Sequence, residues 1–182
     1  FDACGVGERS FYYPYPDYKF MTTVYSDAYL PGRGELSNNL RNFDRDRMLL
    51  FDEKSAFDGI VEEGLFSVFS NSYMAIIGKP LELKYARYSN DRAEEFRIRT
   101  EILADTEGKK TVRKYPLTTE AEAHVRHMAE AYEKLKKRYA GSRLDVNTCH
   151  LGEEEGAIYA EFEFVPGRPL SELMDECLDR QD

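Results

Sequence analysis

The sequence has few cysteines and no long apolar run. Its three cysteines, Cys4, Cys149 and Cys177, are far apart and form no CxxC pair. An odd number of isolated thiols favours reduced cysteines over a disulfide framework or a zinc site. No apolar stretch approaches the roughly 20 residues that a membrane-spanning helix needs. The sequence therefore predicts a cytoplasmic protein without a transmembrane segment.

The sequence also lacks a basic field and the common catalytic motifs. Its 34 acidic side chains outnumber 25 basic ones and give a net charge of -9, so nucleic acid is not an expected partner. A Ser-His-Asp set and a P-loop are both missing, which excludes a proposal of hydrolase activity. His124 and His127 lie three residues apart, but no third ligand follows at a matching spacing, and we predict no metal site.

The turn Gly78-Lys79-Pro80 separates two stretches of different character, and we place a domain boundary between residues 79 and 80. Before it, aromatic residues in short extended pieces alternate with proline and glycine turns. Asp52 is an expected N-cap of a short helix that Gly64 ends. The apolar run LFSVFSNSYMAIIG (65–78) has the length of a strand, and we expect it to be buried on both faces under helices.

After the boundary, residues 80–182 show a regular alternation of strands and helices. A three-stranded meander is followed by a long amphipathic helix, which begins at Thr118 or Thr119 and ends near Gly141. Two more strands and a final helix complete the pattern, and the fold class is α+β. The expected strands are residues 83–89, 94–104, 111–117, 143–151 and 157–165.

This order of five antiparallel strands with one long helix after the third resembles the small, N-terminal lobe of protein kinases and related sugar kinases. The segment TVRKYPL (111–117) is similar to the third strand of that family. The resemblance implies ATP with Mg2+ as cofactors, and Lys114 as a charge beside the nucleotide phosphates. A carboxylate from the following helix would hold this lysine, and Glu122 is the first candidate because it lies near the apolar face.

The segment EFVPGRPL (163–170) resembles the hinge of the same family, whose backbone commonly hydrogen-bonds the adenine edge. Phe164, Val165 and Gly167 are the residues that would line this nucleotide-binding site. The sequence departs from the family in the first turn, which reads SNDRA and has no glycine to let backbone amides approach a phosphate. Asn90, Asp91 and Arg92 are optional contacts there. Lys114 and Glu122 also have an ordinary interpretation as a surface lysine and a helix-dipole carboxylate.

Residues 1–79 contain YPYPDYK (13–19) and FSNS (69–72). They resemble the C-terminal end of class I methyltransferase-like modules in bacterial surface-glycan proteins, where two such strands are neighbours at a sheet edge. The resemblance implies S-adenosylmethionine as cofactor, with its binding loop upstream of Phe1. Tyr13, Tyr15 and Asp17 would form a wall of an acceptor pocket for sugar rings. The alternative is that they pack at a proline-kinked sheet edge.

Together these features predict a fragment of a bacterial multidomain transferase that modifies cell-envelope polysaccharide. The methyltransferase-like tail would span residues 1–79 and the kinase-like lobe residues 80–182. Its partners would be a nucleotide, a glycan substrate and the rest of the parent chain, and it would not be active alone. Two alternatives stay open: a pseudokinase-type scaffold, and a self-contained α+β domain in which both halves form one fold.

Overall fold

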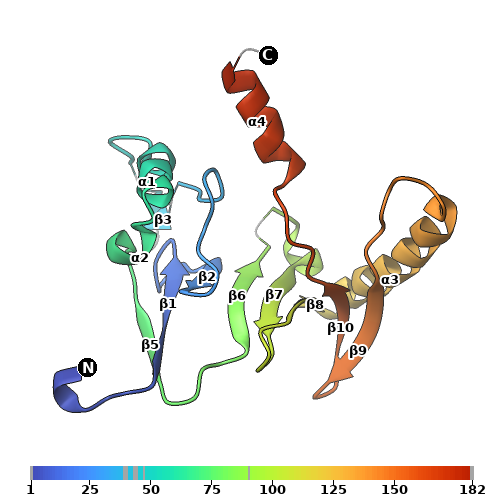
Figure 1. The fold of residues 1–182 in the computed structure, drawn as a ribbon, viewed down its shortest axis with the longest axis horizontal. Helices are drawn as coiled ribbons and strands as arrows, with labels where there is room; N and C mark the ends of the chain where they lie inside the picture. The colour runs from blue at the N-terminus through green and yellow to red at the C-terminus, as the bar shows by residue number, and fades with distance from the viewer. Residues whose placement is uncertain (1, 39–40, 43–44, 47, 90, 181–182) are drawn as a thin grey trace.

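The computed structural model describes residues 2–38, 41–42, 45–46, 48–89 and 91–180 (Figure 1). The fold is mixed α+β, as the sequence predicts, and its largest element is an eight-stranded sheet in which all neighbours pair antiparallel. The strand order is β5-β1-β2-β6-β7-β8-β10-β9. The strands are β1 (Arg9–Tyr15), β2 (Thr23–Ser26), β5 (Met74–Ile77), β6 (Leu83–Tyr88), β7 (Ile98–Ala104), β8 (Lys110–Pro116), β9 (Cys149–Glu154) and β10 (Ala157–Glu163).

The helices that pack on this sheet lie at its opposite ends (Figure 1). Helices α1 (Glu53–Glu62) and α2 (Phe66–Phe69) accompany β1 and β2, whereas α3 (Thr119–Tyr139) packs on β8, β9 and β10. Helix α4 (Leu170–Arg180) rises away from the sheet after β10. A separate ribbon pairs β3 (Arg41–Asn42) with β4 (Arg45–Asp46), and single 3₁₀ turns span Asp2–Cys4 and η2 (Glu94–Phe96).

The expected meander and long helix are confirmed. Strands β6, β7 and β8 pair in sequence order, and α3 begins after Thr118, whose side-chain oxygen accepts a hydrogen bond from the Ala121 amide at 3.1 Å. This contact satisfies one of the amides that a helix start leaves without a partner. Gly141, with φ of +76°, follows the end of the helix. Two strands differ most in their bounds: β7 begins at Ile98 instead of residue 94, because Glu94–Phe96 form a 3₁₀ turn, and β9 spans Cys149–Glu154 instead of residues 143–151.

The expectation of a buried strand over residues 65–78 is wrong. Its first part forms the one-turn helix α2, and only Met74–Ile77 form a strand, β5. The intervening Ser70 and Ser72 turn the chain: the Ser70 hydroxyl donates to the Ser72 carbonyl at 3.1 Å, and Ser72 Oγ accepts from the Tyr18 amide. β5 then lies at the sheet edge, and its Ile77 is 63% exposed. A short apolar run does not by itself distinguish a strand from a helix turn.

The sheet is continuous across position 80. Strand β2 pairs with β6 through Thr23 opposite Arg87 and Val24 opposite Ala86. Tyr12 on β1 strengthens this junction, since its hydroxyl donates to the Leu83 carbonyl at 2.8 Å. Strand β8 pairs with β7 and β10. The boundary predicted from composition therefore falls in a connection within one sheet, and the two halves share backbone hydrogen bonds.

Candidate anion-binding site

Strand β8 lies between β7 and β10 and places Lys114 on the face of the sheet that α3 covers. Lys114 is opposite Thr100 on β7 and Ala160 on β10. Residues two apart in a strand share a face, so Lys114 shares the face of Val112, which packs against the core under α3. The Lys114 ammonium lies 5.6 Å from the centre of the Phe162 ring, a cation–π contact.

The ammonium of Lys114 is half-buried, and its surroundings are positive. Burial lowers its pKa, the nearby Arg92 guanidinium lowers it further, and Cys149 acts in the opposite direction. Among the residues that the structure describes, no carboxylate forms an ion pair with Lys114 or Arg92. A buried positive charge without an anionic partner is costly, and an anionic ligand would relieve that cost.

Arg92 lies near Lys114 and comes from the segment between β6 and β7. One of its terminal nitrogens lies 2.9 Å from Nε2 of His124, which projects from the second turn of α3. Burial is the main cause that lowers the pKa of His124, and Arg92, His127 and Lys114 lower it further. Arg92 and His124 also line a shallow surface pocket of about 430 Å³ together with Ala93, Phe96, Glu120 and Ala123.

Glu122, the predicted partner of Lys114, lies in the first turn of α3 and is half-buried. An ion pair between Glu122 and Lys114 is absent from the contacts of the described residues. The carboxylate therefore stands where it complements the positive end of the helix dipole. Asn90, one of the optional phosphate contacts, lies outside the described residues.

The three connector residues predicted to contact an adenine come together at one pocket. Phe164, Val165 and Gly167 lie between β10 and α4, and with the Tyr29–Gly32 segment they line a pocket of about 690 Å³. The Lys110 ammonium lies 5.2 Å from the Phe164 ring centre and 5.9 Å from that of Tyr29. Lys110 and Lys114 share a face of β8 and are about 13 Å apart, since a strand advances about 3.3 Å per residue.

The predicted acceptor-pocket residues are placed differently. Tyr13 and Tyr15 are buried in a core cluster with Phe66, and the Tyr13 hydroxyl donates to the Asp27 carboxylate. Asp17 accepts hydrogen bonds from the Lys19 and Phe20 amides at 2.7 and 3.0 Å, which closes a tight turn. Tyr15 also lines a pocket of about 300 Å³ in this region. In these contacts Tyr13 and Tyr15 pack in a core from a strand that lies between β5 and β2, and Asp17 stabilises a turn.

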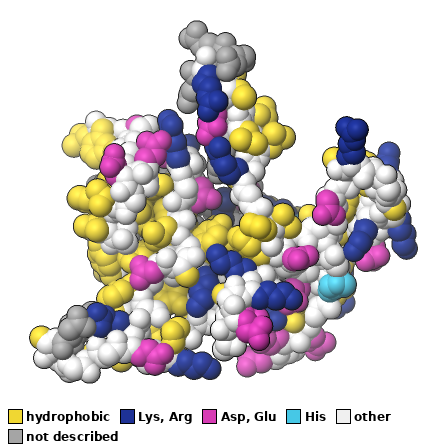
Figure 2. Space-filling model, in the orientation of Figure 1, with side chains coloured by type: hydrophobic (Ala, Val, Ile, Leu, Met, Phe, Trp, Pro, Cys, Tyr) yellow, Lys and Arg dark blue, Asp and Glu magenta, His cyan; other side chains and the backbone are white. Residues whose placement is uncertain are grey.

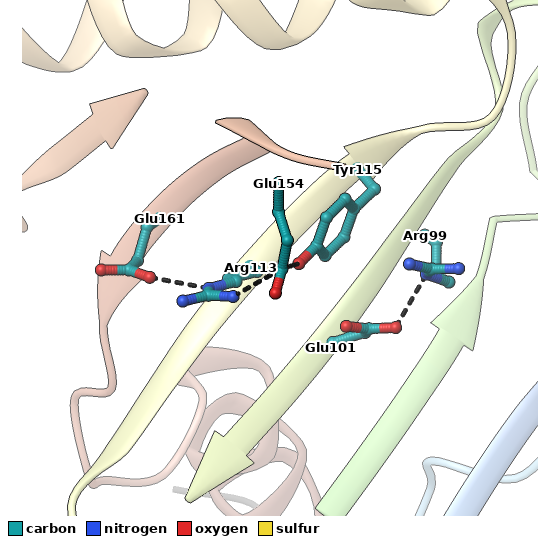
Figure 3. Close-up of polar contacts among 6 residues, drawn as sticks. All are labelled: Arg99, Glu101, Arg113, Tyr115, Glu154 and Glu161. Atoms are coloured by element: carbon teal, nitrogen blue, oxygen red, sulfur yellow. Dashed lines mark hydrogen bonds and ion pairs between the residues drawn. The ribbon is translucent and has the colours of Figure 1, made fainter. Parts of the chain in front are cut away.

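The opposite face of the same strands carries a charged network (Figure 3). Arg113 on β8 donates to Glu161 at 2.7 Å and to Glu154 at 3.0 Å, and the Tyr115 hydroxyl donates to Glu154 at 3.2 Å. Arg99 Nε lies 2.8 Å from Glu101 as an ion pair; it makes no hydrogen bond within the described part of the chain. Sequence reasoning missed this network, although the alternating charges of RIRTE (97–101) signal it.

Comparison with known proteins gives no relative for this chain. No protein family, no curated protein and no solved structure matches it. None of the described helices is long and apolar enough to cross a membrane. Within the described ranges, no group of three His, Cys, Asp or Glu side chains is placed to hold a metal ion.

Proposed function

We propose that residues 80–182 form a nucleotide-binding lobe that holds the polyphosphate of ATP, as part of a larger kinase-like transferase. The observation that carries this proposal is the half-buried Lys114, with Arg92 and His124 beside it and no carboxylate in ion-pair contact among the described residues. The connector pocket lies at the other end of the same strand face, at a separation that suits a nucleotide extended from base to phosphates.

The topology adds support from a second direction. Within the sheet, the five strands from β6 onward have the order first, second, third, fifth, fourth, and α3 lies between the third and the fourth in sequence. This is the arrangement that the sequence resemblance leads us to expect of a kinase-like N-terminal lobe. ATP fits the residues present, because its phosphates are anionic and its base has a flat aromatic face. Mg2+ has no matching ligand group in the described chain, and we assign it no residues here.

A pseudokinase-type scaffold is the second candidate for this half. The segment between β6 and β7 contains no glycine, and Glu122 makes no ion pair with Lys114 in the described contacts. Both features favour a lobe that keeps the shape without efficient phosphoryl transfer. The continuous sheet across position 80 favours the further alternative of one self-contained α+β domain. A role in bacterial polysaccharide modification, with S-adenosylmethionine and a glycan as partners of the parent protein, remains a proposal from the sequence resemblance.

Thermal-shift and calorimetric titration of the chain with ATP tests the proposal. ATP should raise the melting temperature, because a ligand that binds only the folded state stabilises it. Replacing Lys114 by methionine should weaken ATP binding roughly tenfold to a hundredfold, the value of one charge-assisted hydrogen bond. Lys137→Met, at an exposed site near the end of α3, is the matched control and should bind ATP normally. A folded protein whose melting temperature does not change with ATP would instead favour the pseudokinase-type scaffold.

A further inference from the structure

The contact between Arg92 and His124 fixes the protonation state of the imidazole. Arginine only donates hydrogen bonds, so Nε2 of His124, 2.9 Å away, must accept. The imidazole in this contact is therefore neutral and carries its proton on Nδ1. Protonation of Nε2 would place two cations in contact, which agrees with the lowered pKa of His124.

The groups around His124 come from three elements and are mostly positive. Arg92 faces it from the segment between β6 and β7, Lys114 from β8, and His127 from the next turn of α3. Glu120, one turn earlier on α3, is the acidic residue at the rim of the same pocket. Among the described residues it forms no ion pair with Arg92, so it does not neutralise the pair.

We propose that Arg92, His124 and Lys114 together bind one phosphate group, and that His124 takes up a proton from solvent when the phosphate binds. This inference rests on the proposed nucleotide site and assigns the contacts that replace its missing glycine turn. In the bound state Nε2 no longer accepts the hydrogen bond from Arg92. It carries a proton taken up from solvent and donates a hydrogen bond to a phosphate oxygen. Arg92 then donates to the phosphate instead, and the added positive charge is balanced by the dianion.

The coupling has a defined consequence for pH dependence. A bound dianion favours the imidazolium, so phosphate binding should raise the pKa of His124. A rise of one unit corresponds to about tenfold tighter binding to the protonated form. Phosphate affinity should therefore increase as the pH falls from about 8 to about 6, and His124→Gln should remove that increase.

The experiment follows the imidazole resonances of the chain by NMR while the pH is varied, with tripolyphosphate, ATP or adenosine present. Tripolyphosphate and ATP should raise the pKa of His124 by about one unit, and adenosine should leave it unchanged. His127 is the matched control, since its side chain is 71% exposed and lies 4.0 Å from Glu130. His127→Gln should keep the pH-dependent affinity, and Arg92→Gln should lower tripolyphosphate affinity about tenfold.

The outcomes separate this inference from the proposed function. If ATP binds and the pKa of His124 stays unchanged, the proton-coupled phosphate contact is overturned and the nucleotide site stands. If tripolyphosphate binds and raises the pKa of His124, the phosphate contact is supported. If ATP then binds no more tightly than tripolyphosphate, the assignment of the connector pocket to adenine is contradicted. If neither phosphate compound binds to the folded protein, both proposals fail. Circular dichroism of each variant verifies folding, and wild-type titration alone decides the pKa question.

Discussion

The two ends of the sheet are stabilised by cores of different chemistry. Under α1 and α2 the core is aromatic: Tyr13, Tyr15 and Tyr25 surround Phe66, whose ring centre lies 5.4 Å from that of Tyr25. Under α3 the core is built from small and aliphatic side chains. Its buried members are Ile98, Ala121, Val125, Ala129, Cys149, Ala160 and Phe162. A single sheet is therefore covered by an aromatic core at one end and an aliphatic core at the other.

This difference shows how side-chain size and polarity set the demands of a core. Buried tyrosines bring hydroxyl groups that need partners, and here Tyr13 and Tyr15 donate to the Asp27 carboxylate and the Ser37 carbonyl. Alanine at positions 121, 129 and 160 lets α3 approach the sheet closely without any such requirement. The aromatic core depends on hydrogen bonds and the aliphatic core on packing alone.

The largest expected effect is alkaline loss of stability at the aromatic end. Burial raises the pKa of Tyr15 and of Tyr85 from 10.0 to about 12. A group whose folded pKa lies above its unfolded value stabilises the fold fully below pH 10, and this stabilisation is lost as the pH rises through about 12. Each tyrosine accounts for roughly 3 kcal/mol of this loss.

Chemical denaturation between about pH 9 and pH 12 measures this effect. Tyr85→Phe should flatten the decline, because phenylalanine has no proton to lose in the unfolded chain. Tyr18→Phe, at a side chain that is 69% exposed, is the control and should leave the decline unchanged. An equal slope for Tyr85→Phe and the wild type would show that the aromatic core does not set the alkaline limit.

The second effect is the loss of the central ring of the aromatic core. Phe66 is 1% exposed, and Phe66→Ala should lower the free energy of unfolding by about 3 to 5 kcal/mol, from lost burial and the cavity left behind. Phe69 lies in the same short helix and is 53% exposed. Phe69→Ala should cost less than about 1 kcal/mol in urea denaturation, and equal losses for both variants would contradict the packing described.

The corresponding change in the aliphatic core is smaller. Val125 is fully buried, and Val125→Ala removes two methyl groups, which should cost about 2 kcal/mol. Leu135 lies on the same helix and is 39% exposed, so Leu135→Ala is the control. It should lower the free energy of unfolding by about 1 kcal/mol or less. Because β2 pairs with β6, the whole sheet should unfold in one cooperative transition, and both Phe66→Ala and Val125→Ala should shift that transition to lower denaturant concentration. Two separate transitions would show that the halves unfold as independent units.

A hydroxyl deletion distinguishes the two cores directly. Tyr15→Phe, in the core under α1 and α2, removes the hydrogen bond to the Ser37 carbonyl and should cost about 1 kcal/mol in thermal unfolding. Tyr132→Phe, in the core under α3, should be neutral, since the Tyr132 ring packs on Phe162 at 5.1 Å and its hydroxyl makes no hydrogen bond among the described contacts. An equal loss of stability in Tyr132→Phe would contradict this difference between the two cores.

The smallest effect is a gain at the aromatic end. Gly59 lies inside α1, and an added Cβ would meet no atom within 4 Å. Gly59→Ala should therefore stabilise the protein by about 0.5 to 1 kcal/mol through higher helix propensity. Gly64→Ala is the informative counterpart, because Gly64 has φ of +68° and alanine is strained there. A melting temperature that rises for both variants would contradict the backbone assigned at residue 64.

Local patterns were sufficient for much of the fold after residue 80 and for parts of the candidate site. The period of apolar residues and the cap at Thr118 predicted α3, and alternation in TVRKYPL predicted that Val112 and Lys114 share a face. These features depend on neighbours within a few residues. The role of FSVF as a helix turn was not predictable, because a four-residue apolar run satisfies both strand and helix periods.

The sequence by itself determined the element order after residue 80, the helix ends and the side of β8 on which Lys114 lies, since all three follow from local propensity and strand alternation. Only the tertiary structure decided that β2 joins β6 and that Arg92 meets His124, 32 residues away in the chain. Such contacts depend on the relative positions of distant segments, which chain folding sets through many weak interactions and no short motif specifies.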